Sequence, residues 1–241
     1  MRQRLAIVIA AALATFACAA EAFAGSAVLQ LGSGEHTRAL LLTPDRGKPR
    51  GGIVLLPGAD GILNLSESGE VRALQGNQLV RTREDYVRAG FVVILPDAQA
   101  SVAAAVSELR RLTSPVAIVA KSRGSLRAAR VVREGVRADA LVLASAMLEP
   151  HERRPSVPQI LGSPNGLPRT LVIHHRNDGC VVTPPSAVEP FVGWSAGRAR
   201  ATWIDGGVDA GQACGGRGHH GFAGRDADVV RVIARFVAAE R

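Results

Sequence analysis

Residues 116–129, VAIVAKSRGSLRAA, decide the fold that this sequence predicts. Residues 116–120 are all apolar, which is typical of a strand covered on both faces of a sheet. Residues 121–124, KSRG, then place Ser122 at the tip of a short polar turn. The following residues include leucine, alanine and arginine, which favour helix. The sequence therefore predicts a strand, a tight turn with a serine at its tip, and a helix.

The same alternation of apolar runs and helical patterns extends along the chain. Apolar runs predict strands over residues 28–31, 38–43, 52–56, 91–95, 116–120, 138–144, 170–173 and 199–204. Helical patterns cover residues 77–89, 98–112, 125–135, 184–192 and 226–239, while residues 147–167, rich in proline, predict a loop. Buried strands alternating with helices predict an α/β fold with a mostly parallel central sheet flanked by helices. In such a sheet, the functional site is expected at the carboxyl ends of the strands.

The first 24 residues have the pattern of an export signal. Residues 1–4 carry positive charge, residues 5–20 are apolar except for Thr15, and residues 22–24 form an A-x-A cleavage site. We therefore expect a signal peptide over residues 1–24 and a single domain over residues 25–241, located in the periplasm or secreted, with no stable membrane insertion after cleavage. A lipoprotein anchored at Cys18 and a retained N-terminal anchor are the alternatives.

The charge of the chain is basic but dispersed. The net charge is +8, and removal of Arg2, Arg4 and Glu21 with the signal lowers it to +7. Arginines are spread along the chain, and only 4% of residues are aromatic, unlike the basic and aromatic surface of a nucleic-acid-binding protein. We expect no nucleic-acid partner. A mild attraction for anionic substrates stays open.

Two cysteines, Cys180 and Cys214, remain after signal cleavage. An even number of cysteines in an exported protein predicts a disulfide, which would contribute about 4 kcal/mol by closing a long loop. A zinc site is the alternative, with ligands drawn from His174, His175, Asp178, Cys180, Cys214, His219 and His220. No pair of these residues has zinc-finger spacing, so we expect neither a metal nor another cofactor.

Three residues that carry chemistry follow predicted strands in the order Ser122, Asp178, His220. A serine hydroxyl needs an adjacent base to act as a nucleophile, a histidine takes its proton, and a carboxylate orients the histidine. Each has an alternative: Ser122 as a helix cap, Asp178 as a turn residue, and His219 in place of His220.

Residues 120–124, AKSRG, resemble the G-x-S-x-G nucleophile elbow, with Ala120 at the first glycine position. The chain resembles the α/β-hydrolase fold family in this motif and in the chain order Ser-Asp-His. It also resembles that family in the PGADG loop at residues 57–61, in VVTP at residues 181–184 and in His-Gly-Phe at residues 220–222. The match is best to its small esterase or dienelactone-hydrolase-like branch, which has a minimal lid or none.

The resemblance implies cleavage of a small-molecule ester through an acyl-enzyme formed on Ser122, with Asp178 and His220 completing the triad. The backbone N–H groups of Ala59 and Arg123 would form the oxyanion hole, with Asp60 as an alternative to Ala59. A peptidase or acyltransferase with the same triad, and a non-catalytic binding protein of this fold, are the other possibilities.

Two basic residues, Lys121 and Arg123, flank the serine. They would lower the pKa of the serine or favour acidic ester substrates, unless both side chains simply reach solvent. A Cys180–Cys214 disulfide would tie the loop of Asp178 to the glycine-rich loop of residues 206–221. Residues 64–83 are expected to cover one rim of the site or to form ordinary surface.

Overall fold

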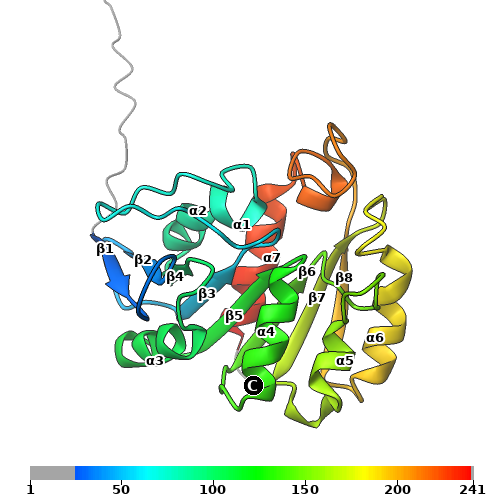
Figure 1. Cartoon of the computed structure of the whole chain (residues 1–241), viewed down its shortest axis with the longest axis horizontal. Helices are drawn as coiled ribbons and strands as arrows, with labels where there is room; N and C mark the ends of the chain where they lie inside the picture. The colour runs from blue at the N-terminus through cyan, green and yellow to red at the C-terminus, as the bar shows by residue number, and fades with distance from the viewer. Residues whose placement is uncertain (1–24, 240–241) are drawn as a thin grey trace, which may run out of the picture.

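The computed structural model describes residues 25–239, so the expected signal peptide over residues 1–24 lies outside the described residues. An eight-stranded sheet with the order β1-β2-β4-β3-β5-β6-β7-β8 forms the centre of the molecule (Figure 1). The strands are β1 Gly25–Gln30, β2 Arg38–Thr43, β3 Gly52–Leu56, β4 Val92–Pro96, β5 Val116–Lys121, β6 Ala140–Ala144, β7 Arg169–His175 and β8 Ala199–Ile204. β2 pairs antiparallel with β1 and β4, and the pairings from β4 to β8 are all parallel.

Helices cover both faces of this sheet. They are α1 Gln78–Arg81, α2 Arg83–Arg88, α3 Val102–Leu112, α4 Gly124–Arg133, α5 Val157–Leu161, α6 Val188–Trp194 and α7 Asp226–Ala238. α1, α2 and α7 pack on one face, and α3, α4, α5 and α6 pack on the other. Figure 1 shows α7 behind the sheet and α4 in front of it. The predicted α/β architecture is therefore confirmed.

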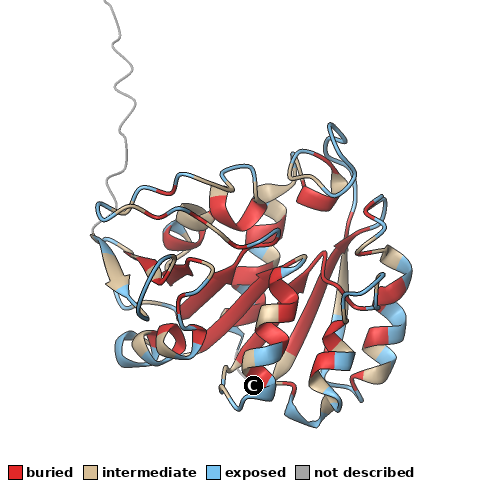
Figure 2. Cartoon of the chain, viewed as in Figure 1, coloured by how far each residue is buried: buried red, intermediate tan, exposed pale blue. Residues whose placement is uncertain are grey.

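The central strands are apolar because helices bury both of their faces. Every residue of β3, β4, β5 and β6 is buried, and Figure 2 shows these strands as the buried centre of the molecule. Burial of apolar surface contributes roughly 25 cal/mol per Å², so this layer is the main source of stability. The candidate site residues follow the carboxyl ends of β3, β5, β7 and β8 in this same sheet.

Two predicted segments differ from the structure. The single helix expected over residues 77–89 is divided into α1 and α2 at Thr82, whose hydroxyl donates to the Gln78 carbonyl oxygen at 2.7 Å. Such a local hydrogen bond competes with regular helical geometry. The loop expected over residues 147–167 contains α5, which begins with a capping box between Ser156 and Gln159. The proline at 158 lies in the first turn of α5, where proline is tolerated.

Candidate active site

The turn after β5 holds Ser122 in a strained backbone conformation. Its φ is 49°, in the left-handed region that non-glycine residues rarely adopt, and its N–H donates to the Ala144 carbonyl oxygen at 3.0 Å. α4 begins two residues later at Gly124, where an added Cβ would lie 2.3 Å from the carbonyl oxygen of Leu56. Only glycine lets the helix approach the end of β3 this closely. The structure therefore has the strand, sharp turn and helix of a nucleophile elbow.

The loop after β3 lies directly against the serine. A Cβ added at Gly58 would lie 2.9 Å from the Ser122 Cβ and 3.5 Å from its Oγ. The next residue, Ala59, also has a positive φ of 56°. In the part of the chain that the structure describes, the N–H groups of Ala59 and Arg123 make no hydrogen bond within the protein. Both donors are therefore available to a bound oxygen atom.

Asp178 and His220 are brought together from loops after β7 and β8. The His220 Nδ1–H donates to the Asp178 Oδ2 at 3.0 Å, and both side chains are buried. This tautomer leaves the His220 Nε2 without a proton and able to accept one. The neighbouring His219 instead stacks on His175, with ring centroids 4.1 Å apart, and its Nδ1 lies 3.1 Å from the Asn177 carbonyl oxygen. Of the two adjacent histidines, His220 is therefore the one bonded to Asp178.

Three further groups hold the Asp178 carboxylate. The Cys180 N–H donates to Oδ1 at 2.9 Å, while the His174 Nε2 lies 3.2 Å and the Thr183 hydroxyl 3.3 Å from Oδ2. Burial alone would raise the pKa of Asp178, but hydrogen bonds from His174 and His220 hold it well below its usual range. Asp178 is therefore ionised and fixed in position.

Neither Thr183 nor the hydrogen bond of His174 is predicted by the sequence pattern. The Thr183 Oγ1 also lies 3.1 Å from the His220 Nδ1, so this hydroxyl contacts both members of the acid–histidine pair. The His174 Nε2 additionally lies 3.0 Å from the Thr183 carbonyl oxygen. The signals in the sequence are the closeness of Thr183 to Asp178, five residues earlier, and its place in the VVTP segment at residues 181–184.

Burial and a nearby cation keep His220 neutral. Burial is the largest cause that lowers its pKa, to about 4, and the second is the positive charge of Lys121. Lys121 itself is only 2% exposed, and its Nζ lies 5.9 Å from the centroid of the Phe222 ring. Burial lowers the pKa of Lys121 to about 7, against the attraction of Asp178. The alternative that both basic neighbours of Ser122 simply reach solvent is wrong for Lys121, whereas Arg123 is exposed.

The expected disulfide is confirmed. Cys180 and Cys214 are bonded, with their Cα atoms 4.6 Å apart. The bond joins the loop of Asp178 to residues 206–221, the segment that leads to His220. The two thiols are consequently not available as zinc ligands, and residues 25–239 contain no cluster of three or more potential metal-binding side chains.

Arg81, on α1, anchors the histidine loop from the other side. Its guanidinium makes a two-point ion pair with Asp226 at 2.8 and 2.7 Å. The same group donates to the Gly221 carbonyl oxygen at 2.7 Å and to that of Gly216 at 3.1 Å. The Ser145 hydroxyl, at the end of β6, donates to the His220 carbonyl oxygen at 3.1 Å. The segment expected to form a rim thus supports the loop that carries His220.

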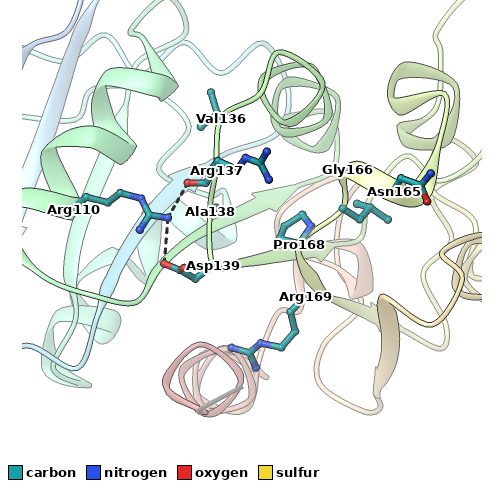
Figure 3. Close-up of a pocket in the computed structure, with 10 residues that line it drawn as sticks. Arg110, Val136, Arg137, Ala138, Asp139, Asn165, Gly166, Pro168 and Arg169 are labelled. Atoms are coloured by element: carbon teal, nitrogen blue, oxygen red, sulfur yellow. Dashed lines mark hydrogen bonds and ion pairs between the residues drawn. The ribbon is translucent and has the colours of Figure 1, made fainter.

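Two hollows lie at opposite ends of the sheet. One, of about 490 Å³, is lined by residues that include Ala59, Arg123 and Gly124, next to Ser122. The other, of about 530 Å³, lies at the amino ends of β6 and β7 (Figure 3). Figure 3 shows the Arg110 guanidinium in that second hollow, bonded to Asp139. The first hollow lies beside the turn at the carboxyl end of β5, and its lining includes both neighbours of that turn, Ala59 and Arg123, but not Ser122, Asp178 or His220 themselves.

Solved structures share this architecture at low sequence identity. The esterase domain of a Rhodothermus marinus protein has a TM-score of 0.62 at 10% identity, covering 89% of this chain and 97% of that chain. XC6422 from Xanthomonas campestris, described as an α/β serine hydrolase without a lid, has a TM-score of 0.55 at 15% identity and covers 90% and 97%. TT1662 from Thermus thermophilus has a TM-score of 0.58 at 14% identity and covers 90% and 99%.

The chain has the α/β-hydrolase fold. Between β6 and β7, the described residues form only the short α5 and the 3₁₀ helix Pro164–Gly166. A scan against models of known protein families and a search of curated proteins found no match. Within residues 25–239, no helix combines the length and the apolar character needed to span a membrane.

Proposed function

We propose that this protein is a serine hydrolase that cleaves a carboxylic ester through an acyl-enzyme intermediate. The observation that carries the proposal is the 3.0 Å hydrogen bond between the His220 Nδ1 and the Asp178 Oδ2. This buried pair follows β7 and β8 at the same edge of the sheet as the strained turn of Ser122. Hydrogen bonds at the end of β6 connect the two sites, since the Ala144 carbonyl oxygen accepts from the Ser122 N–H and the Ser145 hydroxyl donates to the His220 carbonyl oxygen.

In the proposed reaction, the Ser122 Oγ attacks the ester carbonyl carbon while the His220 Nε2 accepts the hydroxyl proton. Asp178 keeps the imidazole in the required tautomer and stabilises the imidazolium that forms. His220 then returns the proton to the leaving alcohol, which leaves an acyl group on Ser122. A water molecule, deprotonated by the same nitrogen, releases the acid.

The oxyanion of each tetrahedral intermediate would accept hydrogen bonds from the N–H groups of Ala59 and Arg123. Both groups lack a partner within the described structure and flank Ser122. Loss of one such donor costs about 3 kcal/mol of transition-state stabilisation. Asp60 stays an alternative to Ala59, because the backbone of the same loop presents both N–H groups.

The likeness to an esterase domain and to a serine hydrolase without a lid supports this reaction class. The small segment between β6 and β7 is consistent with a site that has no lid. We also propose that residues 1–24 are a signal peptide and that residues 25–241 form the exported domain, which the Cys180–Cys214 disulfide supports. N-terminal sequencing of the exported protein should identify Gly25 as its first residue.

A fluorophosphonate probe and p-nitrophenyl esters of varied chain length test the proposal. We expect the probe to label wild-type protein at Ser122 and to leave Ser122→Ala unlabelled. His220→Ala should lower kcat at least about 10³-fold, while the matched variant His219→Ala should retain most of the activity. A folded protein that is not labelled at Ser122 would refute catalysis and favour a binding protein. Labelling without ester hydrolysis would favour a peptidase or acyltransferase.

A further inference from the structure

Five of the 14 residues that line the hollow of about 490 Å³ beside Ser122 are arginines. Its arginines come from the elbow, from α4 and from the segment after β6, and they are Arg123, Arg127, Arg130, Arg153 and Arg154. Among the described residues that line it, Asp60 is the one carboxylate. The Asp60 Oδ1 accepts a hydrogen bond from the N–H of Ile62 at 3.0 Å, within its own loop. The hollow therefore has a marked excess of positive charge.

The guanidinium groups of four of these arginines have no partner among the described residues. Arg127 donates to the carbonyl oxygens of Asp97, at 3.0 Å, and Ala100, which explains its place in the fold. By contrast, no hydrogen bond or ion pair of the described residues involves the guanidinium groups of the other four, Arg123, Arg130, Arg153 and Arg154, and all four are exposed.

Several exposed arginines elsewhere on the surface do have acidic partners. The guanidinium of Arg176 is 3.2 Å from Asp205, and that of Arg72 is 2.8 Å from Glu70. The hollow thus differs from much of the basic surface, because five arginines gather there with one lining carboxylate, Asp60, and none of the five is ion-paired with it. Such a concave cluster concentrates positive potential and attracts anions.

The position of the hollow connects this charge to the proposed reaction. Ala59 and Arg123, whose N–H groups would bind the ester oxygen, form part of its wall. Gly124, the first residue of α4, also lines it, so the positive end of that helix dipole faces the same space. A substrate bound at Ser122 would therefore extend either its acyl or its alcohol portion into the hollow.

We infer that the substrate is an ester bearing a second, anionic group, and that Arg123, Arg130, Arg153 and Arg154 bind this group. A carboxylate is the chemistry that guanidinium groups recognise through paired hydrogen bonds. The inference rests on the proposed function, since it assigns the substrate class of the same site. The arrangement selects a short ester whose carboxylate lies a few bonds from the reacting carbonyl.

Two matched pairs of substrates measure this selection. For the acyl portion, mono-4-nitrophenyl glutarate is compared with the neutral mixed diester methyl 4-nitrophenyl glutarate, after subtraction of spontaneous hydrolysis. For the alcohol portion, 4-acetoxybenzoate is compared with methyl 4-acetoxybenzoate. We expect kcat/KM to favour the charged member of at least one pair by about tenfold or more, as expected for a hydrogen-bonded charged group. The pair that responds identifies the portion lying in the hollow, and the preference should shrink in 0.5 M NaCl, because salt screens exposed charges.

Arginine variants connect the preference to the hollow. The combined variant Arg130→Gln/Arg153→Gln/Arg154→Gln should bring the ratio of charged to neutral kcat/KM to within about threefold of unity. Arg235→Gln is the matched control, because Arg235 is an exposed arginine on α7, across the sheet from α4. It should retain the wild-type ratio. Equal ratios in wild type and the combined variant would overturn the inference.

Binding to Ser122→Ala separates this inference from the proposed function. Monomethyl glutarate should raise the melting temperature of Ser122→Ala, whereas dimethyl glutarate at the same concentration should not. The shift should disappear when the three arginine substitutions are added. Stabilisation of Ser122→Ala by monomethyl glutarate, with no ester hydrolysis by the wild-type protein, would refute the proposed function and still support the anion site. No stabilisation, together with no preference for either charged ester, would refute the anion site alone.

Discussion

Replacement of Lys121 by methionine is expected to change both the stability and the pH profile of this protein. Lys121 is 2% exposed, and burial lowers its pKa from 10.5 to about 7, while Asp178 opposes this change. Between pH 7 and pH 10.5, the unfolded chain therefore binds more protons at this residue than the folded chain. The stability that depends on Lys121 rises with pH across this window and falls as the pH decreases towards 7.

The size of this effect follows from the two pKa values. At about 1.4 kcal/mol for each tenfold change in proton affinity, the difference between 10.5 and about 7 corresponds to about 5 kcal/mol. Methionine keeps an unbranched apolar side chain of similar length and cannot be protonated. Lys121→Met should therefore lack this pH-dependent contribution and should be more stable than wild type at pH 6.

Urea unfolding at pH 6, 8 and 10 measures the prediction. We expect the free energy of unfolding of Lys121→Met, relative to wild type, to be several kcal/mol more favourable at pH 6 than at pH 10. Lys48→Met is the matched control, since Lys48 is an exposed lysine in the loop after β2. Its difference from wild type should stay constant with pH. A constant difference for Lys121→Met as well would refute the argument that Lys121 is desolvated.

The same variant should shift the acidic limb of the activity profile. His220 acts as a base only when neutral, and burial followed by the charge of Lys121 lowers its pKa to about 4. Wild-type kcat/KM should therefore persist to low pH and fall as the pH falls through about 4. Removal of the cation favours the imidazolium, so the limb in Lys121→Met should move to higher pH. An unmoved limb, with folding checked by circular dichroism at each pH, would show that Lys121 does not influence His220.

Three further substitutions test the supports of the site. Gly124→Ala should lower the free energy of unfolding by roughly 2–4 kcal/mol, because its Cβ would lie 2.3 Å from a backbone carbonyl oxygen of β3. Unchanged urea unfolding would contradict the close approach of α4. Cys180→Ser/Cys214→Ser should lower the free energy of unfolding by about 3–4 kcal/mol. The melting temperature and kcat should fall as well. Wild-type values of both would show that the disulfide does not stiffen the pairing of Asp178 with its histidine. Thr183→Val should lower kcat by about tenfold with little change in KM, since the lost hydroxyl lies 3.3 Å from the Asp178 carboxylate. If activity falls only in proportion to the fraction of protein that remains folded, Thr183 has a packing role only.

The sequence predicts the central sheet well because its strands are covered on both faces. Apart from Lys121 at the end of β5, the strands β3, β4, β5 and β6 are continuous apolar runs, and helices bury all of their residues. The elements that were predicted less well depend on individual side-chain hydrogen bonds near helix ends. Thr82 interrupts the helix expected over residues 77–89 through a side-chain hydrogen bond, and the prolines around α5 obscured its capping box.

The candidate site is predictable only where chain order carries the information. Ser122, Asp178 and His220 each follow a strand, so the topology brings them to one edge of the sheet. The roles of His174 on β7, Thr183 in the loop that follows it, and Arg81 on α1 depend on side-chain contacts that leave no periodic pattern in the sequence. The burial of Lys121 was also hidden, since lysine is almost never fully buried.

The two basic residues beside Ser122 have opposite environments, and this difference separates their effects. Lys121 is the last residue of β5, and its side chain is enclosed near Phe222 and His220. Its charge therefore acts within the protein at short range, where low polarity strengthens electrostatic interactions. Arg123 lies one residue beyond the serine, exposed and in the wall of the arginine-lined hollow. High salt should consequently weaken the selection of charged esters while leaving the acidic limb set by His220 nearly unchanged, because salt screens exposed charges far more than buried ones.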